Sequence, residues 1–281
     1  MTSVEHKYQF APFPYFGGKR SVTDDVWKRL GRPTQYIEPF CGSAAVLLSA
    51  PAAASLEVVN DANFYIANFW RALKFQPDAC YQWQDYPVSH IDLAARHHWL
   101  TEPDRCAALC DKLMDAEWPG DAQCAGWWVW GQCAWIGSGW CERKSKVPHV
   151  SNAGMGVRDW FLHLASRLER VRITHGDWTR CLNHHYGGKD TAIFFDPPYK
   201  SFERLYHQNG QRPVAGAVAE WCKENEDVRI ALCGHRGDYD LPGWTVIEWS
   251  RGRLTYGGID TTDEEAIWFS PSCIDPEPEL F

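Results

Sequence analysis

Short apolar runs separated by turns and helical stretches recur through both ends of the chain. The runs are rich in β-branched and aromatic residues and end at glycine, aspartate or proline, a pattern typical of buried strands. We predict strands at residues 36–40, 56–60, 171–174, 191–195, 228–233, 245–249 and 266–270, and helices at 44–54 and 64–75. Strands that alternate with helices in this way predict an open, mostly parallel α/β sheet.

The alternation stops between residues 77 and 158. This segment has several glycines and few clear strands, and it carries six tryptophans: Trp118, Trp127, Trp128, Trp130, Trp135 and Trp140. We interpret these rings as the core of an inserted lobe, because large aromatic side chains are usually buried. The sequence therefore predicts a sheet domain made of residues 1–76 and 159–281, and an inserted, mostly non-sheet domain at 77–158.

Composition narrows the class of protein. Of the 281 residues, 45% are hydrophobic and 23% are charged, which is ordinary for a globular protein with a real core. No apolar run approaches the roughly 18 residues that span a bilayer, and the first residues lack a signal-peptide pattern, so we expect a cytoplasmic protein without a membrane segment. The eleven cysteines are odd in number and form no C-x-x-C pairs. We therefore predict reduced thiols and no metal site.

The net charge of −8 argues against a protein that coats nucleic acid without specificity, because phosphate binding depends on positive charge. Acidic residues gather near the carboxyl terminus, however. The segment between Cys141 and His175 contains seven basic residues and three acidic ones. This excess indicates a local basic face.

The sharpest motif is Phe194-Phe195-Asp196-Pro197-Pro198-Tyr199. It places a polar tetrapeptide at the carboxyl end of an apolar strand, where open α/β sheets bind ligands. The carboxylate of Asp196 and the carbonyl of Pro197 can each accept one hydrogen of an exocyclic amino group, which directs the nitrogen lone pair at an electrophile. The prolines stiffen the turn, and Tyr199 offers a ring on which a base can stack.

A second motif, Glu38-Pro39-Phe40-Cys41-Gly42-Ser43-Ala44, follows the first predicted strand. A glycine turn before a helix lets a cofactor approach the backbone. The motif lacks the G-x-G-x-x-G pattern and so does not indicate NAD. Asp61 lies twenty-three residues after Glu38, near the offset at which an acid meets a ribose hydroxyl in such folds.

The first motif along the chain lies upstream of both, at Tyr15-Phe16-Gly17-Gly18-Lys19. Paired glycines before a lysine permit close approach of the backbone to a ligand. The ring of Tyr15 can contact a flat or sulfonium-bearing ligand. We interpret this motif as part of the same cofactor site.

The three motifs, in this order and with an inserted region before the last, resemble the Dam-like family of DNA adenine N6-methyltransferases, particularly its phage and prophage members. The resemblance runs over most of the chain. It implies a Rossmann-like seven-stranded sheet with a reversed last hairpin, S-adenosylmethionine as cofactor, and double-stranded DNA as partner. It also implies that residues 77–158 recognise the target sequence, and a bacterial host cytoplasm as location if a phage encodes the protein.

The resemblance assigns further roles to single residues. Tyr15, Lys19, Phe40 and Asp61 would line the cofactor pocket. Asp177 would accept a hydrogen bond from the cofactor's adenine amino group, with Trp178 beside the ring. A base inside a duplex cannot reach Asp196, so the base must be flipped out. We expect DNA phosphates to be contacted by Arg143, Lys144, Lys146, Arg251 and Arg253.

Three alternatives remain open at this point. RNA adenine and cytosine N4 present the same kind of amine and fit the same motif. A catalytically silent module that binds S-adenosylmethionine or DNA is the third. The biological role, in restriction-modification or in phage evasion, does not follow from the residues.

Overall fold

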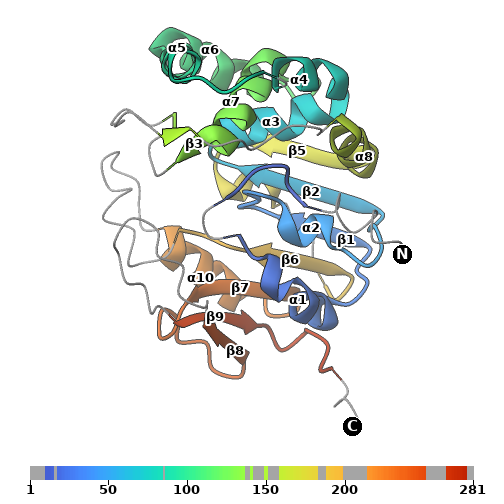
Figure 1. Cartoon of the computed structure of the whole chain (residues 1–281). Helices are drawn as coiled ribbons and strands as arrows, with labels where there is room; N and C mark the ends of the chain where they lie inside the picture. Colours follow the sequence, from blue (N-terminus) through green and yellow to red (C-terminus); the bar gives the residue numbers. More distant parts are fainter. Residues whose placement is uncertain are drawn as a thin grey trace.

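Seven strands form one mixed sheet in the computed structural model, with the order β5-β2-β1-β6-β7-β9-β8 (Figure 1). The structure describes residues 10–15, 18–84, 86–136, 140–141, 149–150, 158–182, 188–198, 214–250 and 264–276. The strands are β1 (Gln35–Glu38), β2 (Leu56–Asp61), β5 (Val171–His175), β6 (Thr191–Phe195), β7 (Arg229–His235), β8 (Thr245–Ser250) and β9 (Glu264–Phe269). Each lies within two residues of a strand predicted from the sequence.

Five strands run parallel, and the last hairpin is reversed. β1 pairs in parallel with β2 and β6, β2 with β5, and β6 with β7. β9 is antiparallel to both β7 and β8. All five residues of the central strand β6 are buried, which explains why it reads as a continuous apolar run. The predicted seven-stranded α/β fold is confirmed.

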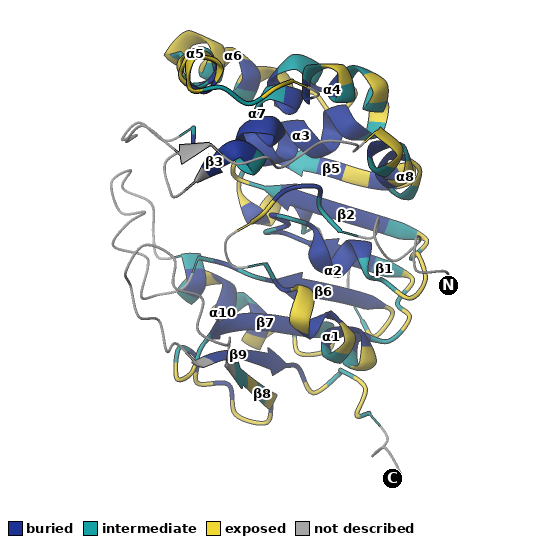
Figure 2. Cartoon of the chain, in the orientation of Figure 1, coloured by how far each residue is buried: buried dark blue, intermediate teal, exposed yellow. Residues whose placement is uncertain are grey.

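Helices cover both faces of the sheet. One hydrophobic cluster holds side chains of α1 (Thr23–Leu30), α2 (Ala45–Leu48) and α3 (Phe64–Phe75). A second cluster, on the opposite face, holds side chains of η3 (Trp178–Cys181) and α10 (Val214–Glu224). A short helical turn, η2 (Arg20–Val22), precedes α1. The central strands β1, β6 and β7 are almost entirely buried, whereas the edge strand β8 is largely exposed (Figure 2).

The helix expected at 44–54 is wrong in length, because α2 ends at Leu48. The next residue, Ser49, turns its N–H and its hydroxyl back to the carbonyl of Ala45. Pro51 has no N–H to donate, so the helical ladder cannot continue through it. The helix predicted at 64–75 is confirmed as α3, and the side chain of Asn63 caps its first turn by accepting from the N–H of Tyr65.

The described part of residues 77–158 is mostly helical. It contains α4 (Pro77–Gln84), α5 (His90–Leu100), α6 (Pro103–Leu113), α7 (Ala122–Ala134), the short strands β3 (Trp135–Ile136) and β4 (His149–Val150), and the first residue of α8 (Arg158–Leu168). These helices stack beyond the β5 edge of the sheet (Figure 1). Four of its tryptophans, Trp128, Trp130, Trp135 and Trp140, are buried. The interpretation of these rings as core is confirmed for these four.

The lobe and the sheet share one hydrophobic core. Phe69 and Trp70 of α3 belong to the same cluster as Trp128 and Trp130 of α7. The rings of Phe69 and Trp128 lie 5.8 Å apart between centroids. The division into a catalytic and a recognition domain stays a prediction, and the packing shows that the two parts are continuous at α3.

None of the eleven cysteines forms a disulfide. Within the described ranges, no helix has both the length and the apolar character needed to cross a membrane.

Candidate active site

The carboxyl ends of the parallel strands meet at one edge of the sheet, and four predicted site segments lie there. β1 ends at Glu38, β2 at Asp61, β5 just before Gly176-Asp177, and β6 just before Asp196. The register places Asp61 beside His175 and Phe195 beside Leu232 of β7. Parallel pairing therefore brings together residues that are far apart in the sequence.

Asp196 forms an ion pair with Lys19. The Lys19 Nζ lies 2.8 Å from Asp196 Oδ2, and the two side chains are 4% and 22% exposed. The other carboxylate oxygen, Oδ1, is not part of this ion pair. The sequence analysis assigned Lys19 to the cofactor pocket and did not foresee this pairing. Both residues stood in separate motifs, and no spacing along the chain connects them.

The glycine turn after β1 is held by groups from β2 and α3. The carboxylate of Asp61 accepts the N–H of Gly42 at 2.9 Å and the N–H of Asn63 at 2.8 Å. The indole N–H of Trp70 donates to the carbonyl of Gly42. The turn is tightly bent, since Gly42 and Ala44 have φ values of 45° and 50°. Asp61 therefore orders the turn, and burial raises the pKa of its carboxyl to about 6.

Asn60 is a site residue that the sequence analysis missed. Its buried side-chain amide donates to the carbonyls of Pro39 and Gly176. It thereby ties the turn after β1 to the turn after β5. The available signal was an asparagine directly after the apolar pair Val58-Val59 in a predicted strand, where a buried polar side chain needs hydrogen-bond partners.

Tyr15 lies directly on the glycine turn. A Cβ added to Gly42 would lie 2.5 Å from the ring of Tyr15, so glycine is needed for this contact. The Gly18 N–H donates to the carbonyl of Tyr15. The ring of Tyr15 is 41% exposed, which leaves part of its surface open to a ligand. The first and second motifs are thus in contact, as one cofactor site requires.

Glu38 lies in the interior beneath this turn and is 2% exposed. Its Oε2 accepts the hydroxyl of Tyr36 at 3.0 Å and the N–H of Leu47 at 3.1 Å. Burial raises the pKa of Glu38 to about 8, and the nearby carboxylates of Asp196 and Asp61 contribute to the rise. Glu38 therefore supports the turn from below through Leu47.

This raised pKa predicts a pH-dependent effect of Glu38→Gln. The unfolded chain releases the proton near the usual pKa of 4.5, whereas the folded protein keeps it up to about pH 8. The folded state binds more protons in this window, so its stability falls as the pH rises. We expect Glu38→Gln to match the wild type near pH 5 and to be about 1–3 kcal/mol more stable at pH 8. Urea unfolding at several pH values measures this difference, and Glu248→Gln, on an exposed side chain, is the control. A difference that does not vary with pH would contradict the assignment.

Aromatic rings flank the turn on its other side. Phe40 stacks near Trp178, with centroids 6.5 Å apart and planes at 25°. Asp177 is exposed, and one of its oxygens accepts from the N–H and the hydroxyl of Thr179. The structure therefore brings Phe40, Asp177 and Trp178 to the carboxyl edge beside Asp61. The thiol of Cys41 is buried, and burial raises its pKa well above the usual value, so it stays neutral.

Several predicted residues lie outside the described part of the chain. These are Phe16, Gly17, Tyr199, Arg143, Lys144, Lys146, Arg251 and Arg253. Their roles stay predictions. Pro197 is buried and Pro198 is half-buried, directly after Asp196.

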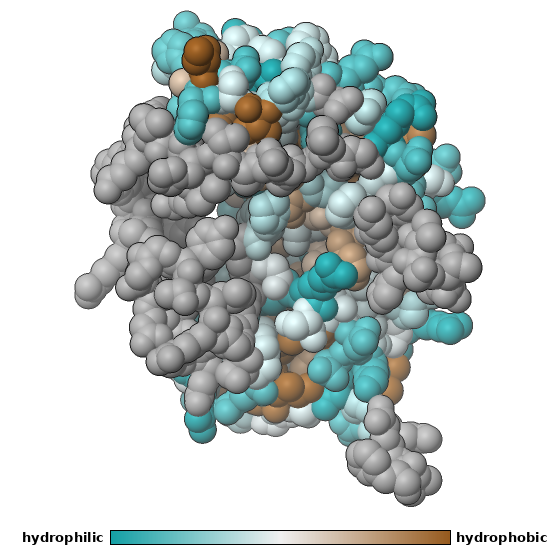
Figure 3. Space-filling model, viewed as in Figure 1, coloured by the Kyte–Doolittle hydropathy of each residue, from teal (hydrophilic) through white to brown (hydrophobic). Residues whose placement is uncertain are grey.

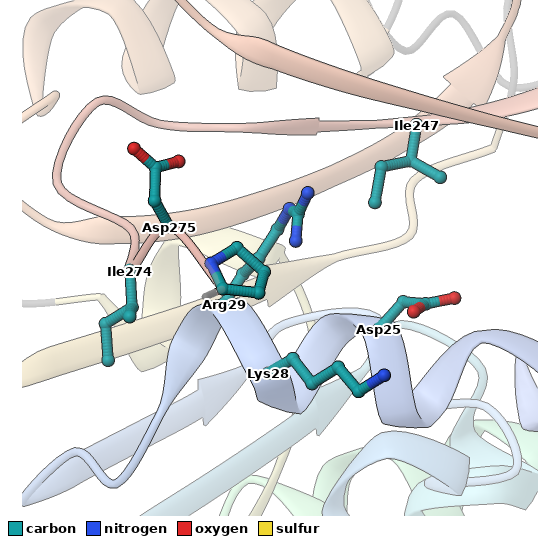
Figure 4. A pocket seen from close by; sticks show the side chains of 7 residues that line it. Asp25, Lys28, Arg29, Ile247, Ile274 and Asp275 are labelled. Carbon is teal, nitrogen blue, oxygen red and sulfur yellow. The ribbon is translucent and has the colours of Figure 1, made fainter. Parts of the chain in front are cut away.

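A pocket of about 600 Å³ lies away from this edge. It is lined by Asp25, Lys28 and Arg29 of α1, Ile247 of β8, and Ile274, Asp275 and Pro276 (Figure 4). The Ile274 N–H donates to the Arg29 carbonyl, and the neighbouring Cys273 thiol donates to Ile230, at the start of β7. The pocket is therefore near the amino ends of the strands. Figure 3 shows that apolar residues lie among polar ones on the face of the molecule seen in Figure 1. It does not belong to the Asp196 site.

Among the described residues, no group of three His, Cys, Asp or Glu side chains is arranged to hold a metal ion. Residues 15–87 match the family described as D12 class N6 adenine-specific DNA methyltransferase. The matched segment contains the first two motifs, and the match confirms the resemblance and supports DNA adenine methylation as the activity. No curated protein matches the chain significantly.

Proposed function

From the match to the D12 class at residues 15–87, we infer that this chain is an enzyme that transfers a methyl group from S-adenosylmethionine to N6 of a flipped-out adenine in double-stranded DNA. The observation that carries the proposal is the position of Asp196-Pro197-Pro198. It follows β6 directly, at the same edge as the matched motifs, and Asp196 contacts Lys19 of the first motif.

Asp196 and Pro197 prepare the amino group for reaction. An adenine amino nitrogen is a poor nucleophile because its lone pair is delocalised into the ring. Oδ1 of Asp196 and the carbonyl of Pro197 each accept one amino hydrogen, which frees the lone pair. Positive charge develops on this nitrogen during transfer, and the carboxylate stabilises it. The proton then leaves to Asp196 or to water.

The residues around the glycine turn fit S-adenosylmethionine. Phe40 offers a half-buried ring for a purine, backed by the buried ring of Trp178, and Asp177 offers a carboxylate oxygen for the purine's amino group. Tyr15 offers an aromatic face for a sulfonium. When bound, the cofactor supplies an electrophilic methyl group. The protein contributes alignment, which is a large part of the acceleration in a direct transfer.

The proposed DNA contacts belong to two segments of the sequence, residues 143–146 and residues 251–253. Arg143, Lys144, Lys146, Arg251 and Arg253 would bind phosphates and offset the cost of base flipping, which is a few kcal/mol. The net charge of −8 means that these contacts must be local. We therefore expect DNA binding that weakens steeply with added salt.

The test is a transfer assay. Purified protein is incubated with tritium-methyl S-adenosylmethionine and mixed-sequence duplex DNA, and the labelled nucleosides are separated by chromatography. Label in N6-methyldeoxyadenosine supports the proposal. Label in N4-methyldeoxycytidine would make cytosine the substrate base. Label that appears only when RNA is used in place of the DNA would make RNA the substrate. Cofactor binding without label in any nucleic acid would indicate a silent module.

Gly42→Ala is expected to weaken cofactor binding more than it weakens the fold. The added methyl group would collide with the ring of Tyr15, and alanine disfavours a φ of 45°. We expect the Kd for S-adenosylmethionine to rise by about tenfold or more, since a strained turn costs about 1–3 kcal/mol. Isothermal titration calorimetry measures it. Gly237→Ala, at a positive φ with no atom within 4 Å of the added group, is the control for strain alone. Equal cofactor affinity in Gly42→Ala and wild type would contradict the assignment.

A further inference from the structure

We propose that Glu265 is a positioning residue for the Lys19–Asp196 pair, and that its carboxylate draws part of the Lys19 ammonium charge away from Asp196. This inference rests on the proposed function, in which Asp196 accepts amino hydrogens. Glu265 belongs to none of the sequence motifs described above. It lies on β9, in the reversed hairpin at the far side of β7.

The strand register places Glu265 on the same face as the pair. Residues directly opposite each other in a ladder point to the same face. Glu265 is opposite His235 of β7 and Trp249 of β8. Cys233, two residues before His235, belongs to the cluster that also contains Phe194, and Asp196 follows Phe194 by two residues. Asp196, Cys233 and Glu265 therefore project to the face that α1 covers.

Only β7 separates the two acidic residues. β6 pairs with β7, and β7 pairs with β9, so Asp196 and Glu265 are two strands apart. Strands are spaced about 4.8 Å apart, which puts the two backbones on the order of 10 Å from each other. A lysine side chain between them can be attracted by both carboxylates. Lys19 is 4% exposed and Glu265 is 7% exposed, so water screens this interaction weakly.

The electrostatics of Lys19 agree with this placement. Burial lowers the pKa of the Lys19 amine, whereas Asp196, Cys233 and Glu265 raise it, and the net change is upward. Lys19 therefore stays an ammonium throughout the ordinary pH range. Because the carboxylates of Asp196 and Glu265 both attract the Lys19 ammonium, neither carboxylate is fully neutralised by it.

This sharing has a chemical consequence at Asp196. A carboxylate that fully neutralises an ammonium ion is a weaker acceptor toward a third group. A second carboxylate near Lys19 leaves more negative charge on Asp196, where an amino group must bind and become positive. Among the described residues, His235 and Cys233 of β7 are titratable groups on the same face of the sheet as Glu265. Glu248, on β8, pairs with the exposed Arg236 at 3.1 Å and serves as a control.

The first experiment compares Glu265→Gln with Glu248→Gln. Glu265→Gln leaves the Lys19 ammonium to Asp196 alone, so the acidic limb of kcat/KM should move to lower pH in this variant. We expect kcat to fall about tenfold, because an acceptor interaction that strengthens in the transition state is weakened. KM for DNA and for S-adenosylmethionine should change by less than about twofold. Glu248→Gln should match the wild type in every respect. An unchanged limb and an unchanged kcat in Glu265→Gln would overturn the proposal.

The second experiment examines the Lys19–Asp196 ion pair directly, in the absence of methyl transfer. The carboxyl carbon of Asp196 is followed by ¹³C NMR against pH and is identified by its loss in Asp196→Asn. Its titration should move to lower pH in Glu265→Gln. Should that variant not fold, Lys19→Met is compared with Lys19→Met/Glu265→Gln, and the double variant should titrate lower. Identical titrations would refute the role of Glu265. A wild type that methylates no nucleic acid would refute the proposed function instead, and this titration would still decide the pairing.

Discussion

Asp196→Asn is expected to abolish methyl transfer while leaving cofactor affinity nearly unchanged. The asparagine oxygen can still face the Lys19 ammonium, which turns the amide NH₂ toward the substrate. The amide NH₂ and the substrate amino group are both hydrogen-bond donors, so the acceptor that the substrate requires is missing. We expect kcat to fall by at least about a thousandfold, the loss typical when a group that stabilises charge in the transition state is removed. Single-turnover transfer to duplex DNA measures the loss, and calorimetry measures S-adenosylmethionine binding.

This variant also has a stability effect that must be separated from catalysis. Lys19 is 4% exposed, and Asp196→Asn leaves its ammonium without the carboxylate partner at Oδ2. Breaking a buried pair costs about 3–5 kcal/mol. Asp196→Asn/Lys19→Met removes both charges, so it should recover most of the lost Tm and remain inactive. Asp190→Asn, on an exposed side chain just before the same strand, is the control. More than about 1% of wild-type kcat in Asp196→Asn would contradict the mechanism.

Arg71→Met is expected to destabilise the protein strongly, because Arg71 joins the lobe to the sheet. Its guanidinium, on α3, donates to the carbonyls of Leu113 and Asp115 after α6, and to that of Ile173 in β5. Arg71 is 2% exposed, so the carbonyls that it leaves cannot all turn to water. We expect a loss of about 3 kcal/mol or more, since each buried acceptor left unpaired costs about 1–3 kcal/mol. Tm should fall by roughly 6–12 °C in a chain of this size.

The matched control is Arg158→Met. Arg158 forms an ion pair with Asp78 at 2.7 Å, but both side chains are more than half exposed. Exposed pairs contribute at most about 1 kcal/mol. Thermal unfolding followed by circular dichroism compares the two variants. Equal shifts in Tm would contradict the role assigned to Arg71, and a smaller, separate transition in Arg71→Met would show that the lobe unfolds on its own.

Local pattern determined most of the sheet. The runs at 56–60, 171–174 and 191–195 became β2, β5 and β6 within one residue. The run at 191–195 is apolar because all five residues of β6 are buried, on both faces of the sheet. The helix at 64–75 was predictable from its apolar spacing. The helix expected at 44–54 was not, because alanine favours a helix but does not show where a serine and a proline end it.

The motifs at Glu38–Ala44 and Asp196–Tyr199 also determined which residues gather at the carboxyl edge, since each followed a strand, and parallel strands end together. The sequence by itself did not determine what those residues contact. Lys19 binds Asp196, Asp61 holds Gly42, and Glu38 lies beneath the turn. The first two contacts join residues that are 177 and 19 positions apart in the sequence. The third is a matter of how far a side chain is buried. Only tertiary packing decides such contacts, because burial and the distance between charges depend on the whole fold rather than on neighbours in the chain.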